Sequence, residues 1–231
     1  MDTVSSMVEL SGGNSQRNTV GYLARPEQSG RHPAVIVIHE IWGLVDHIKD
    51  IANRLAREGF VAFAVDLFDR KLVSSIEEGR QIRQALTEQR VFGDLDGAFS
   101  YVRALDYVRL DRIGSIGFCM GGGLSLQLAC RNEELAAAVV FYGRNPSPID
   151  LVKNIRCPVL GNYAGADKGI TEADIDLLKQ TLAKYGKEFD AKIYPGAPHA
   201  FFNDARETYR PDAAKDAWER TLRFFNTYLK K

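Results

Sequence analysis

The chain has 231 residues, of which 45% are hydrophobic, and this suits one large α/β domain or two small ones. Its 30 Lys and Arg residues balance 30 Asp and Glu residues, so the charge gives no reason to expect a nucleic-acid partner or a membrane surface. Each apolar run is too short to span a bilayer, and the N-terminus lacks the basic and apolar regions of a signal peptide, so we expect a cytoplasmic protein.

Strands and helices are predicted to alternate along the chain. Short β-like runs at 3–9 and 19–24 flank Ser11-Gly12-Gly13-Asn14, which predicts an antiparallel hairpin. Later apolar runs predict buried strands at 34–38, 61–65, 112–116, 136–143, 157–163 and 189–194. Helical spacing of apolar residues predicts helices around 48–55, 95–105, 124–129, 171–185 and 218–229, and residues 66–93 should form a loop and one helix. The alternation predicts one α/β domain over 1–231, with a mostly parallel, doubly wound sheet and helices on both faces.

The stretch Gly117-Phe118-Cys119-Met120-Gly121-Gly122 joins a predicted strand to a predicted helix. In that context the pattern Gly-x-Ser-x-Gly forms a nucleophile elbow, and here cysteine takes the middle position. The helix N-terminus would favour a thiolate. A small buried cysteine is one alternative; a phosphate-binding turn is another, but its lysine and Ser/Thr are missing. With Cys130 and Cys157 the cysteines number three, which indicates a reducing compartment, and no pair has zinc-ligand spacing.

Several chemically active residues follow predicted strand ends, where ligand sites of such sheets lie. They are His39, Glu40, Asp66, Cys119, Tyr142, Asp167 and His199. Cys119, Asp167 and His199 also occur in the chain order of elbow hydrolases, which is nucleophile, acid, histidine. His199 would take the thiol proton and later protonate the leaving oxygen, while Asp167 would hold the tautomer of the imidazole.

Other roles are open for the individual members of this set. His199 follows Pro-Gly-Ala-Pro and could be a turn residue. Asp167 precedes a predicted helix and could cap it. Thr171 and Asp174 give that helix a capping-box-like start. His39 is the competing base, but it precedes the elbow, and we expect it to bond the backbone instead.

Acyl transfer also needs preorganised donors for an oxyanion. We expect one at the backbone N–H of Met120, directly after the nucleophile, and the other at Ile41, in the loop after the third strand. Glu40 stands beside that loop, and a carboxylate near a Cys–His pair is unusual. The alternative is that Glu40 is a buried acid bound by backbone N–H groups or by an arginine.

Four segments in chain order carry a family resemblance: the elbow at 117–122, His-Glu-Ile-Trp-Gly-Leu at 39–44, Ala-Gly-Ala-Asp at 164–167 and Pro-Gly-Ala-Pro-His-Ala-Phe at 195–201. They resemble the dienelactone hydrolases, or carboxymethylenebutenolidases, of the α/β-hydrolase fold, over nearly the whole chain. The resemblance implies a triad of Cys119, His199 and Asp167, and a Glu40 that interacts with the resting thiol and controls its ionisation. It also implies opening of a carboxylate-bearing unsaturated lactone to maleylacetate, with no cofactor.

A substrate carboxylate needs a cation, and arginine binds it bidentately. The resemblance points to Arg80 or Arg83 in the segment over the site. A second arginine that the family can carry after the histidine is missing, because Phe201-Phe202-Asn203-Asp204 stands there and Arg206 is out of register. This departure leaves open which lactone or ester is the substrate.

We therefore expect a hydrolase of small lactones or esters, of the dienelactone type. Tyr142 matches a pocket-lining position of the family, although it could equally be a core aromatic, and Trp42 is a further candidate for substrate binding. A general carboxylesterase or thioesterase with the same triad, and a non-catalytic ligand-binding member, are the alternatives. The expected partner is a small molecule, and the expected assembly is a monomer or a small homo-oligomer, with no metal.

Overall fold

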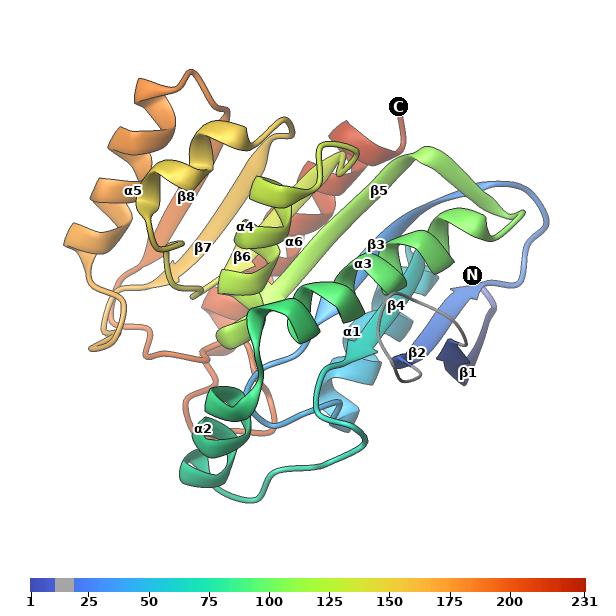
Figure 1. Cartoon of the computed structure of the whole chain (residues 1–231), viewed down its shortest axis with the longest axis horizontal. Coiled ribbons are helices and arrows are strands. Elements are labelled where there is room, and N and C mark those ends of the chain that lie inside the picture. Colours follow the sequence, from blue (N-terminus) through green and yellow to red (C-terminus); the bar gives the residue numbers. More distant parts are fainter. Residues whose placement is uncertain (11–18) are drawn as a thin grey trace. The chain divides into compact units, whose positions relative to one another are not determined.

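The computed structural model describes residues 1–10 and 19–231 (Figure 1). The predicted hairpin turn Ser11-Gly12-Gly13-Asn14 lies outside the described residues. The chain divides into two compact units, Met1–Ile113 and Gly114–Lys231. A single domain over 1–231 stays a prediction.

The first unit contains four strands in the order β1-β2-β4-β3. They are β1 (Thr3–Leu10), β2 (Thr19–Pro26), β3 (His32–Ile38) and β4 (Val61–Asp66). β1 and β2 are antiparallel, as predicted, and β2 also runs antiparallel to β4. β3 and β4 are parallel, with Ala34 opposite Val61. Side chains from both faces of β4 are buried, which explains its unbroken apolar run.

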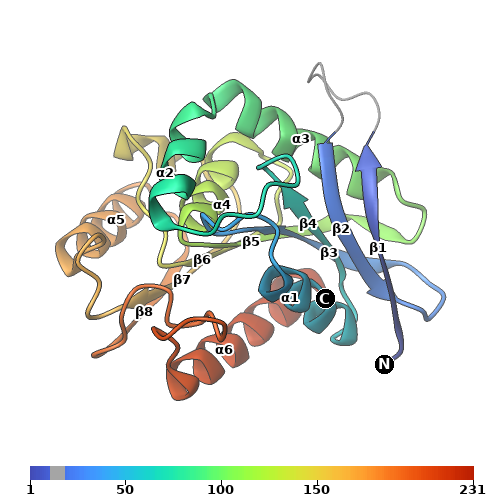
Figure 2. The same cartoon turned by 90° about the horizontal axis from the view of Figure 1, so that it is seen from below.

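Three helices complete the first unit: α1 (Asp46–Arg57), α2 (Ile76–Ala85) and α3 (Glu88–Ala104). Figure 2 shows α1 and α3 on opposite faces of its strands. Gly59, two residues after the end of α1, has φ +91°, the left-handed conformation in which glycine commonly ends a helix. The segment 66–93 holds the one helix expected, α2, but α3 begins earlier than its apolar stripe suggested because Thr87 caps it by accepting a hydrogen bond from the N–H of Arg90.

The strand β5 (Val108–Phe118) begins in the first unit and ends in the second. The second unit continues with α4 (Met120–Arg131), β6 (Ala137–Phe141), the short 3₁₀ helix η1 (Ile149–Asn154), β7 (Val159–Ala164), α5 (Glu172–Lys184), β8 (Phe189–Tyr194) and α6 (Pro211–Leu229). Its strands are parallel and ordered β5-β6-β7-β8. In Figure 2, α4 and α5 cover one face of these strands and α6 covers the other.

Three details of the second unit bear on the sequence predictions. The expected capping box of α5 is present, because Thr171 and Asp174 exchange side-chain-to-backbone hydrogen bonds. β5 starts earlier than predicted, at Val108, because polar and partly exposed residues between Arg109 and Arg112 interrupt the apolar run at its start. α6 likewise starts earlier, with Pro211 in its first turn.

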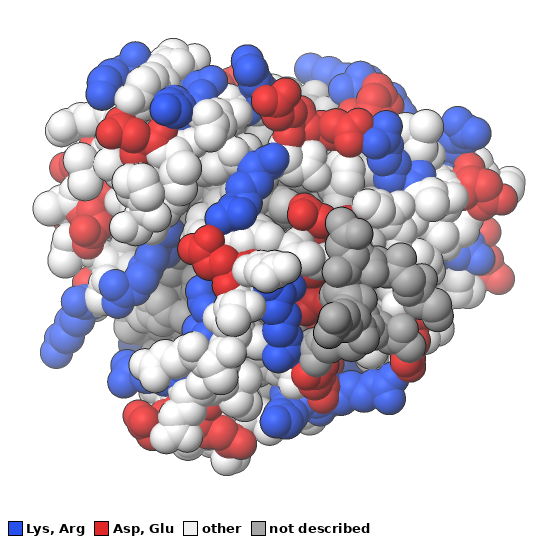
Figure 3. Space-filling model, in the orientation of Figure 1, with Lys and Arg blue, Asp and Glu red and all other residues white. Residues whose placement is uncertain are grey.

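The described surface carries interspersed charges of both signs, as the face in Figure 3 shows. Within residues 1–10 and 19–231, no helix is long and apolar enough to cross a membrane. The same residues include no cluster of three or more His, Cys, Asp or Glu side chains that could hold a metal ion.

Candidate active site

A strained turn joins β5 to α4 at Cys119. Cys119 has φ +54° and ψ −114°, a conformation that non-glycine residues rarely adopt. The turn needs glycine at position 117, because a Cβ atom there would lie 1.9 Å from the carbonyl oxygen of Gly121. The backbone N–H of Cys119 donates to the carbonyl oxygen of Phe141 at 3.0 Å. The half-buried thiol is thus held at the N-terminus of α4, as the elbow pattern predicts.

The first turn of α4 packs directly on the chain after β6. A Cβ atom on Gly143 would lie 2.3 Å from backbone atoms of Gly122 and Gly123. This contact fixes the elbow from a second side, and the sequence analysis did not assign it. Its only signal in the sequence is a run of three glycines after Cys119 and a further glycine after a buried strand.

Asp167 and His199 meet at the ends of β7 and β8. Oδ2 of Asp167 lies 2.5 Å from Nδ1 of His199. Oδ1 accepts hydrogen bonds from the backbone N–H groups of Gly169 (2.8 Å) and Ile170 (3.2 Å). The Asp167 side chain is only 4% exposed, so the carboxylate is fixed on both oxygens and is aimed at the imidazole.

The charges of this pair are mutually stabilised. Burial disfavours the imidazolium form of His199, but hydrogen bonds to Asp167 and Cys119 and the charges of both partners outweigh it and raise the pKa of His199 to about 10. Burial also disfavours ionised Asp167, yet hydrogen bonds from His199 and Gly169 lower the pKa of that carboxyl group. Since Nδ1 faces Asp167, Nε2 is the ring nitrogen left for the Cys119 sulfur. The structure therefore brings all three predicted triad residues together.

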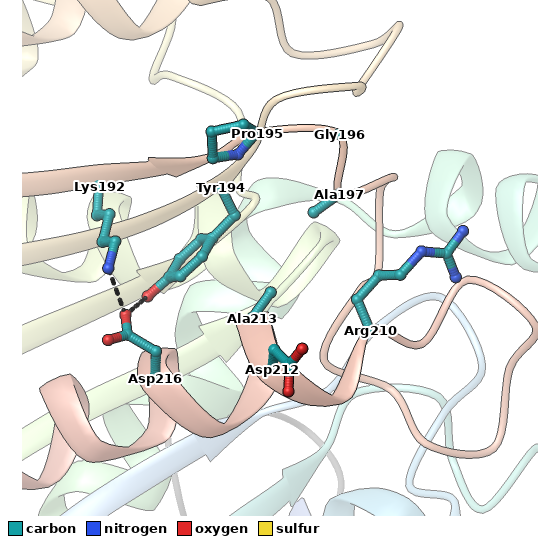
Figure 4. A pocket seen from close by; sticks show the side chains of 9 residues that line it. All are labelled: Lys192, Tyr194, Pro195, Gly196, Ala197, Arg210, Asp212, Ala213 and Asp216. Atoms are coloured by element: carbon teal, nitrogen blue, oxygen red, sulfur yellow. Dashed lines mark hydrogen bonds and ion pairs between the residues drawn. The ribbon is translucent and has the colours of Figure 1, made fainter.

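Backbone bonds and an ion pair fasten the segment that leads to His199. The backbone N–H of Gly165 donates to the carbonyl oxygen of Tyr194, and that of Ala166 to Ala197, each at 2.9 Å. Lys192 Nζ and the Tyr194 hydroxyl each contact Oδ2 of Asp216 on α6 at 2.7 Å (Figure 4). These contacts tie the strand before His199 to α6 and to the Asp167 loop.

A pocket of about 490 Å³ lies at this junction of β8 and α6. The residues that line it are Lys192, Tyr194, Pro195, Gly196, Ala197, Arg210, Asp212, Ala213 and Asp216 (Figure 4). None of them is a predicted site residue. The pocket is therefore distinct from the triad, although it borders the turn that carries His199.

Aromatic rings pack around the imidazole. Tyr142 is fully buried with φ +39°, and its ring centroid lies 5.0 Å from that of His199 and 5.5 Å from that of Phe201. Phe202 stacks on Phe118 at 5.4 Å. Tyr142 thus packs on the imidazole of His199, and its predicted role in lining a substrate pocket stays a prediction. The positions after His199, where the missing arginine would stand, are buried aromatics.

In the first unit, His39 is a structural residue. Its Nδ1 lies 2.5 Å from the backbone oxygen of Glu40, and its Nε2 accepts a hydrogen bond from the backbone N–H of Leu67 at 3.1 Å. Burial lowers the pKa of His39, against a smaller opposing effect of its bond to Glu40 and of the charge of Asp66. The ring is therefore neutral and bonded to the backbone on both nitrogens, which confirms the backbone-bonding role expected for it.

The loop after β3 carries three further predicted residues of the first unit, Glu40, Ile41 and Trp42. Glu40 is 2% exposed, while Ile41 and Trp42 are half-buried. A Cβ atom on Gly79 of α2 would lie 2.6 Å from the carbonyl oxygen of Ile41, so α2 packs closely on this loop. The roles of Glu40, Ile41 and Trp42 toward Cys119 and a substrate stay predictions.

Arg80 and Arg83 lie on α2, next to the contact between Gly79 and Ile41. Arg80 is exposed and Arg83 is half-buried, and neither guanidinium group has a hydrogen bond or an ion pair to the part of the chain that the structure describes. Both are therefore cations available to a ligand, and which of them binds a substrate stays a prediction.

The sequence profile of the Dienelactone hydrolase family matches residues 19–229. A Saccharolobus solfataricus protein that carries the provisional name carboxymethylenebutenolidase is 39% identical, over 90% of this chain and 94% of its own. A Bradyrhizobium protein, provisionally named a 2-oxo-3-(5-oxofuran-2-ylidene)propanoate lactonase, is 34% identical over 94% of this chain and 92% of its own. A Klebsiella pneumoniae crystal structure, provisionally described as a dienelactone hydrolase, has a TM-score of 0.91 and 31% identity, and the match covers 99% of this chain and 100% of that one.

These matches define the fold as that of an α/β hydrolase, with a mostly parallel sheet and helices, as predicted. The chain belongs to the dienelactone hydrolase family. It is accordingly a hydrolase that acts on carboxylic esters or lactones.

Proposed function

We propose that the chain hydrolyses small lactones and esters of the dienelactone type through a Cys119–His199–Asp167 triad. The observation that carries this proposal is the 2.5 Å bond between Asp167 and His199, together with the hydrogen bond between His199 and Cys119. A nucleophile, a base and an orienting carboxylate in contact are the arrangement that nucleophilic acyl transfer needs.

In the proposed reaction, the Cys119 thiolate adds to the carbonyl carbon, a C–S bond forms and the carbonyl π electrons move to oxygen. The oxyanion is bound by the backbone N–H groups of Met120 and Ile41. The tetrahedral intermediate then collapses, the C–O bond breaks and the His199 imidazolium gives its proton to the leaving oxygen. Water, deprotonated by His199, attacks the thioester, and Cys119 leaves as a thiolate.

The proposed substrate class rests on the family resemblance and on the cations that the chain offers. A lactone that bears a carboxylate would pair with Arg80 or Arg83, whose guanidinium groups have no partner among the described residues. The Bradyrhizobium relative supports this class, because its provisional name is that of a lactonase for a propanoate. With dienelactone as substrate the product would be maleylacetate. We further propose a cytoplasmic monomer or small homo-oligomer that acts without a cofactor.

A general carboxylesterase is the second candidate, and one observation favours it. Phe201 and Phe202, which follow His199, are buried and aromatic, so neither of these two positions supplies a cation for a substrate carboxylate. Small uncharged esters would suit such surroundings.

The test is turnover of cis- and trans-dienelactone and of p-nitrophenyl acetate by the wild type and by Cys119→Ala. We expect Cys119→Ala to lose about 10³-fold or more in kcat on every substrate, since triad members act as a unit. Cys130→Ala, which changes a buried cysteine elsewhere on α4, is the matched control and should keep its activity. Faster turnover of the dienelactones than of the acetate supports the first candidate, and the reverse supports the second. Activity retained in Cys119→Ala overturns both.

A further inference from the structure

Arg144 stands at the end of β6, two residues after Tyr142. Its backbone packs on the first turn of the helix that follows the nucleophile, because a Cβ atom on Gly123 would lie 3.1 Å from the carbonyl oxygen of Arg144. On its other side, Nδ2 of Asn145 donates to the backbone oxygen of Asp174 at 2.7 Å. The Arg144 backbone is therefore fixed between α4 and the start of α5.

The guanidinium group of Arg144 reaches the loop that carries Asp167. One of its terminal nitrogens lies 3.5 Å from the point where a Cβ atom of Gly169 would stand, and Oδ1 of Asp167 lies 3.5 Å from the same point. Asp167 is nevertheless committed to His199 and to backbone N–H groups. Arg144 thus borders the first turn of α4, which follows Cys119, and the loop that carries Asp167, and it lies two residues after Tyr142.

This cation is available to a ligand. Arg144 is exposed, and it has neither a hydrogen bond nor an ion pair to the residues that the structure describes. The pKa of Asp174 is lowered mainly by hydrogen bonds from Thr171, and the charge of Arg144 adds a smaller effect. Five N–H donors on a planar group, held by a rigid backbone, suit a carboxylate, which two parallel hydrogen bonds would bind.

We propose that Arg144 binds the carboxylate of an anionic lactone or ester and so determines the charge specificity of the site. The inference rests on the proposed hydrolase function and names a residue that the sequence analysis did not select. The residues that follow His199 are buried aromatics and cannot pair with an anion. Arg144, which also belongs to the second unit, would supply the missing cation. A substrate held there would have its carboxylate beside the Asp167 loop, where the positive charge of Arg144 offsets the repulsion from Asp167 and Asp174.

The kinetic test compares p-nitrophenyl hydrogen succinate, which carries a carboxylate, with p-nitrophenyl acetate, which does not. Arg144→Met should raise KM for the succinate ester about 10-fold or more and leave kcat/KM for the acetate within about twofold, because only the anion loses a charge-assisted hydrogen bond. Arg144→Lys should recover part of the loss. Lys168→Met is the matched control, since it removes an exposed cation from the loop that carries Asp167 and leaves Arg144 in place. Equal losses on both esters, or an equal loss in Lys168→Met, would overturn the assignment.

A binding measurement separates this inference from the proposed function. Calorimetric titration of p-nitrophenyl hydrogen succinate into Cys119→Ala, and into the same variant with Arg144→Met, needs no catalysis. The inference predicts an affinity about 10-fold weaker for the double variant. Unchanged affinity overturns the role of Arg144 even if Cys119 is the nucleophile. A weaker affinity of the double variant supports the role of Arg144, whether or not the wild type hydrolyses the two esters. If the wild type hydrolyses neither ester, only the proposed function is overturned.

Discussion

Nδ1 of His199 lies 2.5 Å from Oδ2 of Asp167, while the second oxygen of the carboxylate is occupied by the backbone N–H groups of Gly169 and Ile170. The aspartate therefore has one acceptor left for the imidazole and no freedom to turn away from it. Such an arrangement fixes the tautomer of the ring and directs Nε2 away from Asp167, toward the thiol.

Replacing Asp167 by asparagine should lower kcat by about 10³–10⁴-fold, because the amide can stabilise the wrong tautomer of His199. The backbone bonds to Gly169 and Ile170 can persist, since the amide oxygen still accepts them. The measurement is steady-state turnover of p-nitrophenyl acetate beside circular dichroism of the same sample. A folded Asp167→Asn protein with near-normal kcat would show that the carboxylate does not orient the base.

Stability should depend on pH through His199, whose pKa is raised from 6.5 to about 10 in the folded protein. A group with a raised pKa contributes stability that is fully present below pH 6.5 and is lost as the pH rises through about 10. The imidazole is 37% exposed, so solvent screening reduces the size of the effect. Urea unfolding between pH 6 and 10 should show that the difference in the free energy of unfolding between the wild type and His199→Asn shrinks as the pH rises. Parallel curves for the two proteins would contradict the ion pair.

The contact between Gly143 and the first turn of α4 predicts a stability effect. Gly143→Ala should reduce the free energy of unfolding by about 1–3 kcal/mol, because the new Cβ atom meets the backbone of Gly122 and Gly123. The matched control is Gly93→Ala in α3, where no atom lies within 4 Å and alanine should be neutral or stabilise by about 0.5–1 kcal/mol. Urea denaturation gives the free energy of unfolding of both variants. Similar changes in Gly143→Ala and Gly93→Ala would show that position 143 does not lie close to the backbone of α4.

Glu40 is predicted to restrain the thiol at rest. A carboxylate beside Cys119 would disfavour the thiolate by repulsion and could accept a hydrogen bond from the neutral thiol, until an anionic substrate draws Glu40 toward an arginine or His199. This control would also protect the thiol from oxidation. Glu40→Gln should therefore be alkylated faster by iodoacetamide at neutral pH and should turn over carboxylate-bearing lactones more slowly. Identical alkylation profiles across pH would leave Glu40 a structural acid of its loop.

The triad was predictable from the sequence because each member follows the end of a predicted strand. The apolar runs at 112–116, 157–163 and 189–194 placed those ends within a few residues, and the Gly-x-Cys-x-Gly pattern selected Cys119. The capping box at the start of α5, formed by Thr171 and Asp174, was also predictable from the sequence. These predictions succeeded because they depend on local sequence and on one general property of parallel sheets.

The remaining features depend on contacts between distant segments. No pattern in the sequence around Gly79 indicates that the carbonyl oxygen of Ile41 occupies the space that a side chain at position 79 would fill. Tyr142 was expected to line a pocket, but its packing against His199 depends on a positive φ angle that the sequence does not reveal. Arg144 also directly follows the predicted strand 136–143, but its approach to the Asp167 loop depends on the tertiary fold, and no local pattern in the sequence indicates it.

The identity of the nucleophile is tested most directly by trapping the acyl-enzyme. Wild type and His199→Asn would be mixed with a slowly deacylated p-nitrophenyl ester, quenched in acid within one turnover, digested and examined by mass spectrometry. The proposed mechanism predicts an acyl group on the peptide that contains Cys119, absent from Cys119→Ala, with much slower formation in His199→Asn. An acyl group found on another residue, or an unmodified Cys119 during active turnover, would contradict it.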